Sequence, residues 1–136
     1  MVAATEPPWP WITKQARIDV ATTKLEVVDF AMQCNPRLVV AGTRNIRSDD
    51  GERAARTVLC VRDQGRTLDV ILTYSERDAH DGPTLFETAT KLQADGCEEA
   101  LDLDRGPSTG GVLRTSGSEE RVELRGPIRH AIAFTH

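Results

Sequence analysis

The densest group of titratable side chains in the chain is the segment 76–81, which reads Glu-Arg-Asp-Ala-His-Asp. Carboxylates and an imidazole this close together can share a proton as an acid–base pair. We therefore name Asp78 and His80 as candidate catalytic residues. The segment lacks the HExxH or CxxC spacing of metal sites, so no metal is expected. The alternative is a solvated loop in which Asp81 favours the N-terminus of a following helix.

His130 is the third candidate catalytic residue. It belongs to the run 128–134, in which isoleucine, histidine, isoleucine and phenylalanine alternate with other residues. Alternation places the imidazole on the apolar side of a strand. There it is either a core histidine bonded to the backbone or a base in a cavity, with Asp78 among its possible partners. The environment of His130 therefore separates a packed domain from an enzyme.

Two other segments could have indicated a known chemistry and do not. The glycine-rich loop 106–111 is not followed by the Gly-Lys-Ser/Thr of a phosphate-binding loop, and a hairpin is expected after it. A Gly-x-Ser-x-Gly elbow for a nucleophilic serine is absent from the sequence. No cofactor is expected.

The cysteines favour a reducing compartment. Cys34, Cys60 and Cys97 are odd in number, and no two have CxxC spacing. Because Cys60 lies in an apolar run, we expect buried free thiols. The sequence contains no apolar run long enough to span a membrane and no secretory signal at its start. We therefore expect a cytoplasmic protein without membrane contact.

Charge is unevenly distributed along the chain. The net charge is -4, and residues 76–104 carry nine acids against two bases. This balance argues against nucleic-acid binding, which requires neutralisation of phosphates. It fits a protein partner with a basic surface, and we name Glu98, Glu99 and Asp102 as candidate contact residues. A merely solvated acidic face is the alternative.

The first fifteen residues differ from the rest of the chain. They contain three closely spaced prolines and both tryptophans, Trp9 and Trp11. Proline fixes φ and lacks an N–H donor, so this arm should be extended. The indoles either cover the domain's own core or bind a partner, and we include both among the candidate partner-binding residues.

Two helices are expected to support these residues. Thr23 to Glu26 and Thr84 to Glu87 both have the spacing of a capping box. The apolar pattern that follows each box predicts helices over 24–34 and 84–95. A strand is the alternative for the first segment, because its two adjacent valines are β-branched.

The strands are expected to pair through short turns. The runs 37–47, 54–62 and 68–74 predict a three-stranded antiparallel meander. A short strand over 100–103 follows, and then a hairpin that pairs 112–114 with 121–124. The run 128–134 completes the set and has apolar or small residues on both sides. Such a strand is either central or an edge buried in a homodimer.

Together these elements predict an α+β fold. Its mostly antiparallel sheet of about six or seven strands carries two helices on one face, which makes a two-layer sandwich. At 136 residues the chain is one domain. We expect an extended arm over 1–15 and a single domain over 16–136.

The sequence supports two hypotheses about function. The first is a small cytoplasmic interaction domain without catalysis, of the immunity, inhibitor, secretion-chaperone or adaptor type. It rests on the acidic stretch and the aromatic arm. The second is a small-molecule enzyme or binder that uses a His/Asp pair in a cavity between sheet and helices. We favour the first, because no catalytic signature appears in the sequence.

Overall fold

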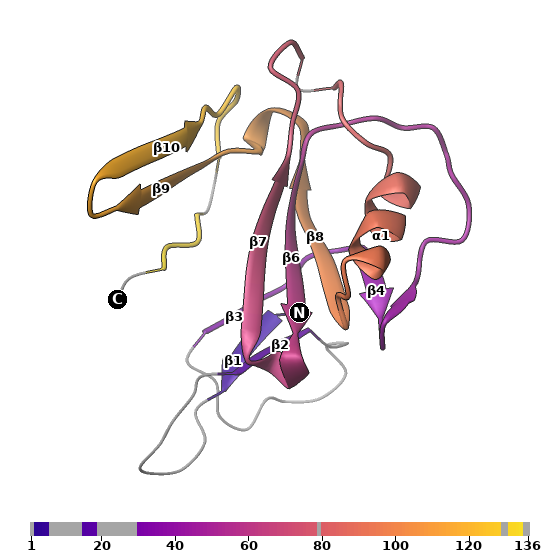
Figure 1. The fold of residues 1–136 in the computed structure, drawn as a ribbon. Helices are drawn as coiled ribbons and strands as arrows, with labels where there is room; N and C mark the ends of the chain where they lie inside the picture. The colour runs from indigo at the N-terminus through magenta and orange to yellow at the C-terminus, as the bar shows by residue number, and fades with distance from the viewer. Residues whose placement is uncertain (1, 6–14, 19–29, 79, 129–130, 135–136) are drawn as a thin grey trace.

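The computed structural model describes residues 2–5, 15–18, 30–78, 80–128 and 131–134. Its centre is a five-stranded sheet in the order β5-β4-β8-β6-β7 (Figure 1). The strands are β4 (Arg37–Val40), β5 (Thr43–Arg44), β6 (Arg56–Arg62), β7 (Thr67–Thr73) and β8 (Glu99–Arg105). Every neighbouring pair is antiparallel. This sheet is the frame that holds the candidate site.

Strand β6 is covered on both faces, which explains its unbroken apolar run. Val58 and Cys60 face a cluster that includes the helix residues Ala89 and Leu92. Leu59 belongs to a second cluster, on the other face, together with residues of the N-terminal strands. Alternate side chains of a strand point to opposite faces, so burial on both sides removes the polar positions.

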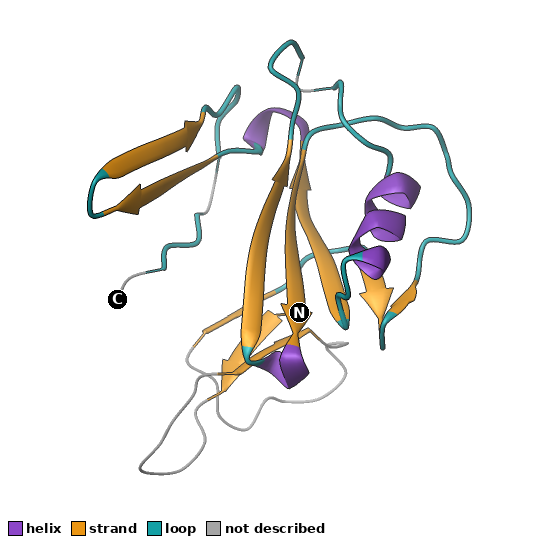
Figure 2. Cartoon of the chain, viewed as in Figure 1, coloured by secondary structure: helices purple, strands orange, loops and turns teal. Residues whose placement is uncertain are grey.

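One α-helix, α1 (Leu85–Ala94), is present in the described residues, and it lies against one face of the sheet (Figure 2). The Thr84 hydroxyl accepts a hydrogen bond from the Glu87 amide, and the Glu87 carboxylate accepts one from the Thr84 amide. This pair of bonds satisfies amides that the first helical turn leaves open. The predicted capping box and helix at 84–95 are confirmed.

Two smaller sheets accompany the central one. In the first, β1 (Val2–Thr5) lies between β2 (Gln15–Ile18) and β3 (Phe30–Met32). In the second, β9 (Gly111–Thr115) pairs with β10 (Ser118–Val122) as a hairpin, close to the predicted one. Figure 1 shows this hairpin standing beside the main sheet, on the side of β7.

The predicted two-layer sandwich with two helices is wrong. The described part of the chain has one α-helix and two single-turn 3-10 helices (Asp63–Gly65 and Gly106–Ser108), and its strands are divided among three sheets. Residues 30–32, placed in the first predicted helix, form β3 instead. A strand was the alternative prediction for this segment, because two adjacent β-branched valines precede it. Its pairing with β1 stabilises that alternative. The earlier part of that predicted helix, 24–29, lies outside the described residues.

The predicted meander is correct in the pairing of two of its strands and wrong in two other respects. The run 37–47, expected as one strand, turns at Ala41 and Gly42 and forms the two strands β4 and β5. Strands β6 and β7 pair through seven residues, as expected. The expected neighbour of β6 on its other side was β4, but β8 lies between them. A short connection favours a hairpin, yet the link from β4 to β6 is long enough for another strand to be inserted.

The predicted strand over 128–134 is not formed in the part of that segment which the structure describes. Residues 128 and 131–134 are not part of any strand. Ile132 is half-buried against the cluster that contains Leu59. The described part of this segment therefore packs against a face of the sheet without extending it.

The cysteines correct a further expectation. Cys60 and Cys97 form a disulfide that joins β6 to the turn after α1, with their Cα atoms 5.6 Å apart. The predicted free thiols at these two positions are therefore wrong, and Cys34 is the free cysteine. Spacing along the chain did not reveal the pair, because the fold brings together residues 37 positions apart.

Nowhere in the described residues does a helix combine the length and apolar character that crossing a membrane requires.

Candidate functional site

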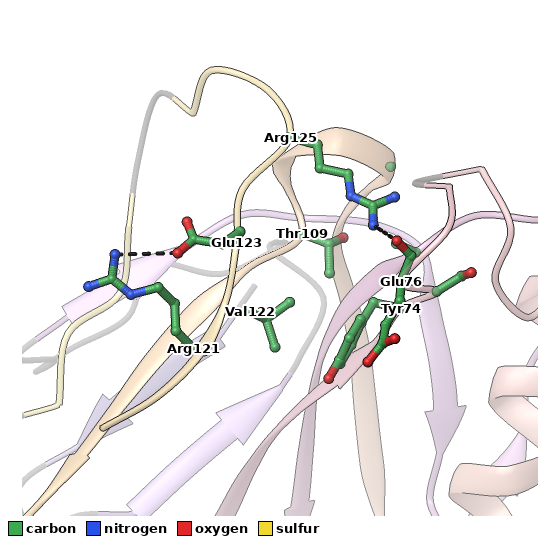
Figure 3. Close-up of a pocket in the computed structure, with 10 residues that line it drawn as sticks. Tyr74, Glu76, Thr109, Arg121, Val122, Glu123 and Arg125 are labelled. Atoms are coloured by element: carbon green, nitrogen blue, oxygen red, sulfur yellow. Dashed lines mark hydrogen bonds and ion pairs between the residues drawn. The ribbon is translucent and has the colours of Figure 1, made fainter. Parts of the chain in front are cut away.

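A hollow of about 240 Å³ lies at one end of the central sheet, beside the β9–β10 hairpin (Figure 3). It sits where β6 begins and where β7 and β8 end, and the chain that follows β10 closes its far side. Its lining combines a phenol, hydroxyls, carboxylates and guanidinium groups: Ala55, Tyr74, Ser75, Glu76, Gly106, Thr109, Arg121, Val122, Glu123 and Arg125. We take this hollow as the candidate site.

The floor of the hollow is a tight turn after β8. Gly106 has φ +74°, and its amide donates to the Ala55 carbonyl over 2.8 Å. The amide of Thr109 then donates back to the Gly106 carbonyl over 3.0 Å. A residue with a side chain would be strained at that φ, so glycine allows the chain to turn here. The turn holds Thr109 in a fixed position in the hollow.

The far wall is packed on this turn through a second glycine. A Cβ on Gly126 would come within 2.8 Å of the Pro107 side chain. The Arg125 amide, next to it, donates to the Pro107 carbonyl over 2.9 Å. A side chain at position 126 would therefore push the wall away from the floor.

Arg125 bridges the two walls of the hollow. Its Nη2 donates to the backbone oxygen of Glu76 over 2.6 Å, as Figure 3 shows. This single bond leaves other N–H groups of the guanidinium available, and a guanidinium can bind phosphate through two parallel bonds. Figure 3 also shows the Glu76 carboxylate beside the ring of Tyr74, which is 51% exposed.

The second arginine of the lining is differently engaged. Arg121 donates to Glu119 over 2.8 Å and to Glu123 over 3.4 Å. Arg114 also donates to Glu119, and these bonds lower the pKa of the Glu119 carboxyl. In Figure 3, Arg121 and Glu123 lie on the side of their strand away from Tyr74. Arg121 is therefore held on the outer face of the hairpin.

A buried ion pair lies under the floor. Arg56 is 0% exposed and Asp102 is 3% exposed, and Arg56 Nη1 donates to Asp102 Oδ2 over 3.2 Å. The same guanidinium donates to the carbonyls of Glu52 and Pro83. Burial raises the pKa of Asp102 to about 6, against the opposing pull of Arg56. Arg56 thus joins three segments that meet beneath the hollow.

The structure brings together two of the three predicted catalytic residues. Asp78 and His80 lie in an exposed loop, with Asp78 Oδ1 3.2 Å from His80 Nδ1. The His80 amide also donates to Asp78 Oδ1, which is the main reason for the lowered pKa of that carboxyl. The loop follows Ser75 and Glu76, which line the hollow, and the Ser75 hydroxyl donates to Asp81, so the loop lies at the rim of the hollow. His130 lies outside the described residues.

The predicted partner-binding carboxylates make contacts inside the chain. The Glu99 carboxylate accepts a hydrogen bond from the Arg37 guanidinium over 2.5 Å, and the Glu98 carboxylate accepts one from the backbone N–H of Gln64. Asp102 lies in the interior with Arg56, and not on the surface where we expected it. Trp9 and Trp11 lie outside the described residues. The acidic stretch is therefore partly neutralised by the chain's own bases.

Sequence reasoning missed Thr109, Arg125 and Tyr74. Thr109 belongs to the glycine-rich loop 106–111, which lacks the Gly-Lys-Ser/Thr motif of a phosphate-binding loop. Arg125 follows the expected hairpin and is not part of any recognised sequence motif. Glu76 belonged to the titratable cluster but was not singled out. The available signal was positional, since Tyr74 and Thr109 follow the ends of β7 and β8, the two strands that pair with β6.

Among the residues that the structure describes, no three histidine, cysteine, aspartate or glutamate side chains are grouped as metal ligands. The hollow itself is lined by arginine, carboxylate and hydroxyl groups.

Comparison with known protein families bears on the choice between the two hypotheses about function. The family model NAGPA, described as phosphodiester glycosidase, matches residues 11–135. The chain belongs to the phosphodiester glycosidase family. No curated protein and no solved structure matched the chain. The family match spans both sides of the hollow and favours the enzyme hypothesis, which we had ranked second.

Proposed function

We propose that the protein is a hydrolase that cleaves the bond between a sugar's anomeric carbon and the oxygen of a phosphodiester. The observation that carries this proposal is the phosphodiester glycosidase match over residues 11–135. The hollow supports it, because it combines a guanidinium with a carboxylate and an exposed aromatic ring. These are the groups needed to hold a phosphate, handle a proton and face a sugar.

The proposed reaction consumes one water molecule. The anomeric carbon–oxygen bond breaks, its electron pair stays on the phosphate, and water supplies a hydroxyl to the sugar. The products are the free sugar and a phosphomonoester. The second pKa of a phosphomonoester is about 6, so this leaving group departs without strong acid assistance. The main demands on the protein are neutralisation of phosphate charge and activation of water.

Arg125 is the group best placed to hold the phosphate. It is fixed by one hydrogen bond to Glu76 and keeps further donors free for the two anionic oxygens. Arg121 is less suited, because two carboxylates already accept its hydrogen bonds. A guanidinium that stabilises the departing phosphate contributes most when bond breaking is advanced.

Glu76 is the proposed general base. Its carboxylate lies in the hollow beside Tyr74, whereas Glu123 is turned toward Arg121. A carboxylate in this place can accept the proton of the attacking water. The Tyr74 ring next to it offers an exposed face for the sugar. The loop with Asp78 and His80 lies at the rim and is the second source of proton-transfer groups.

The proposal is tested with methyl diesters of hexose 1-phosphates, in α and β forms, in water enriched in ¹⁸O. Glycosidic cleavage places the label in the released sugar, whereas attack at phosphorus places it in the phosphate. Methyl hexosides and dimethyl phosphate serve as control substrates, each lacking one half of the diester. Label in the phosphate alone, or no turnover of any diester, would contradict the proposal.

A matched pair of variants tests Glu76. We expect Glu76→Gln to lower kcat by roughly 10²- to 10⁴-fold, the usual contribution of a general base. Glu120→Gln is the control, because Glu120 is an exposed carboxylate on β10 outside the lining of the hollow. Equal activities in the two variants would remove Glu76 from the mechanism.

The disulfide also bears on where the protein acts. Disulfide bonds such as Cys60–Cys97 persist in oxidising compartments and are rare in the reducing cytosol. This observation supports an oxidising compartment in place of the cytoplasm that we expected. The test is thiol alkylation of protein from its native cell under denaturing conditions, where two protected cysteines are expected and three free thiols would contradict it.

A binding role is the second candidate function, and a specific feature favours it. The hairpin exposes Val112 and Leu113 by more than half on opposite faces. Exposed apolar side chains on a projecting element are typical of a contact surface. A protein partner with a basic surface and a homodimer remain predictions. Light scattering of the chain tests the homodimer.

A further inference from the structure

Four buried polar side-chain atoms lack a hydrogen-bond partner in the described part of the chain: Arg37 Nε, Thr73 Oγ1, Asp102 Oδ1 and Thr109 Oγ1. A buried hydroxyl without a partner destabilises the fold, so each such group requires an explanation. Of the four, only Thr109 lines the hollow. It is 4% exposed, and its hydroxyl oxygen is shielded from bulk solvent at the edge of the hollow.

The surrounding structure holds this hydroxyl in place. The Thr109 amide is bonded to Gly106, and Gly106 is bonded to Ala55 at the start of β6. On the far side, a Cβ at Gly110 would come within 2.7 Å of the Leu124 side chain, so the chains are in close contact there as well. Figure 3 shows Thr109 between Val122 and the bridge from Arg125 to Glu76. Thr109 is thus held in place in the hollow that Arg125 also lines.

We propose that the Thr109 hydroxyl binds the substrate, donating a hydrogen bond to an anionic oxygen of the phosphodiester. This inference rests on the proposed function and adds a specific phosphate contact to it. A hydroxyl and a guanidinium that line the same hollow can present donors to one ligand, and phosphate oxygens accept several donors at once. The bond also gives the orphaned oxygen a partner, which the free protein lacks.

Phosphate is favoured over a sugar hydroxyl for an electrostatic reason. A hydrogen bond to a charged oxygen is about twice as strong as one between neutral groups. The neighbouring cation, Arg125, attracts the anionic half of the substrate to the same place. The sugar is left to the opposite side, where the exposed ring of Tyr74 lies.

Binding of dimethyl phosphate, measured by NMR chemical-shift titration of the whole protein, tests this inference without requiring turnover. The key variant is Thr109→Val, which replaces the hydroxyl by a methyl group of similar size. The matched control is Thr73→Val, because Thr73 also has a buried unpartnered hydroxyl but does not line the hollow. Methyl hexoside is titrated in parallel as the neutral half of the substrate.

We expect Thr109→Val to weaken dimethyl phosphate binding by roughly tenfold or more, the usual effect of losing a hydrogen bond to a charged group. Thr73→Val should leave binding unchanged. Neither variant should unfold at a lower temperature, because each removes an unsatisfied hydroxyl. A weaker phosphate affinity with unchanged thermal stability distinguishes a binding residue from a structural one.

Three results would overturn the inference. Equal dimethyl phosphate affinity in Thr109→Val and the unsubstituted protein would leave the hydroxyl bonded to water alone. Selective loss of methyl hexoside binding would assign it to the sugar. Absence of dimethyl phosphate binding to the unsubstituted protein, up to about 50 mM, would exclude a phosphate site, since a few hydrogen bonds give millimolar affinity. Binding without hydrolysis of any diester would contradict the proposed function and leave the phosphate contact intact.

Discussion

The protein contains arginine–carboxylate pairs in two opposite environments. Arg56 and Asp102 are buried on β6 and β8, two strands that adjoin the hollow at one end of the central sheet. On the β9–β10 hairpin, Arg121 pairs with Glu119 and Glu123 in contact with solvent. The atoms in the two groups are chemically alike, and the distances overlap. Water is what differs between them.

This difference determines what each group can do. On the hairpin, solvent screens the charges, and an exposed pair contributes roughly 0–1 kcal/mol to stability. In the sheet, each charge has lost its hydration, so removing one partner leaves the other buried and unpaired. The buried pair therefore acts as a constraint on three segments, whereas the hairpin pairs adjust to their surroundings.

The largest predicted effect is at the buried pair. Arg56→Met should lower the free energy of unfolding by about 3–5 kcal/mol, because Asp102 then stays buried without its partner. The double variant Arg56→Met with Asp102→Leu should recover most of this loss. Urea unfolding of both proteins measures the effect. A double variant as unstable as Arg56→Met would show that the carbonyl contacts of Arg56 matter more than the charge pair.

Removal of the disulfide should come second. It closes a sequence separation of 37 residues, which corresponds to roughly 3–4 kcal/mol of loop-closure entropy in the unfolded chain. Replacing Cys60 and Cys97 together with alanine should lower stability by about this amount in urea unfolding. Cys34→Ala is the control and should change stability much less. Equal effects would mean that the bridge does not constrain the unfolded chain.

The third prediction concerns pH. The pKa of Asp102 is raised to about 6 in the fold, so between about pH 4 and pH 6 the folded protein holds a proton that the unfolded chain has released. The contribution of this group to stability is therefore present at low pH and is lost as pH rises toward 6. The loss amounts to about 3 kcal/mol at most.

The comparison with Asp102→Asn isolates this slope from the other carboxylates, two of which, Asp78 and Glu119, have lowered pKa values. The stability difference, unsubstituted protein minus variant, should decrease between about pH 4 and pH 6. An increase over that range would mean that attraction to Arg56 outweighs burial.

The smallest effect is expected on the hairpin. Arg121→Gln should change the free energy of unfolding by less than about 1 kcal/mol, since solvent already screens its two ion pairs. Adding 1 M salt to the unsubstituted protein should have an effect of similar size. A loss comparable to that of Arg56→Met would mean that the hairpin is essential to the fold and not an adjustable element.

Local patterns in the sequence were sufficient for several elements. The capping box at Thr84, the pairing of β6 with β7 and the hairpin all depend on residues close together in the chain. The insertion of β8 between β4 and β6 depends on contacts between distant residues, and alternation does not encode them. The same holds for the disulfide.

The candidate site was predictable only in part, for the same reason. The Asp78–His80 contact is local and was expected from the cluster. The hollow gathers its residues from the ends of β7 and β8 and from the segment after β10, far apart in sequence. Burial of Asp102 could not be predicted from alternation, because Asp104, two residues along β8, has the same parity and is exposed, whereas Asp102 is enclosed with Arg56.

The position of β8 has a consequence for how the chain acquires this structure. It is the last of the five strands along the chain, yet it occupies the centre of the sheet. During synthesis, β4 and β6 emerge before β8, so the edge that each strand later pairs with β8 is still unpaired. The two halves of the core close only when residues up to Arg105 have left the ribosome. Such non-local closure slows folding and exposes strand edges to neighbouring chains in the interval.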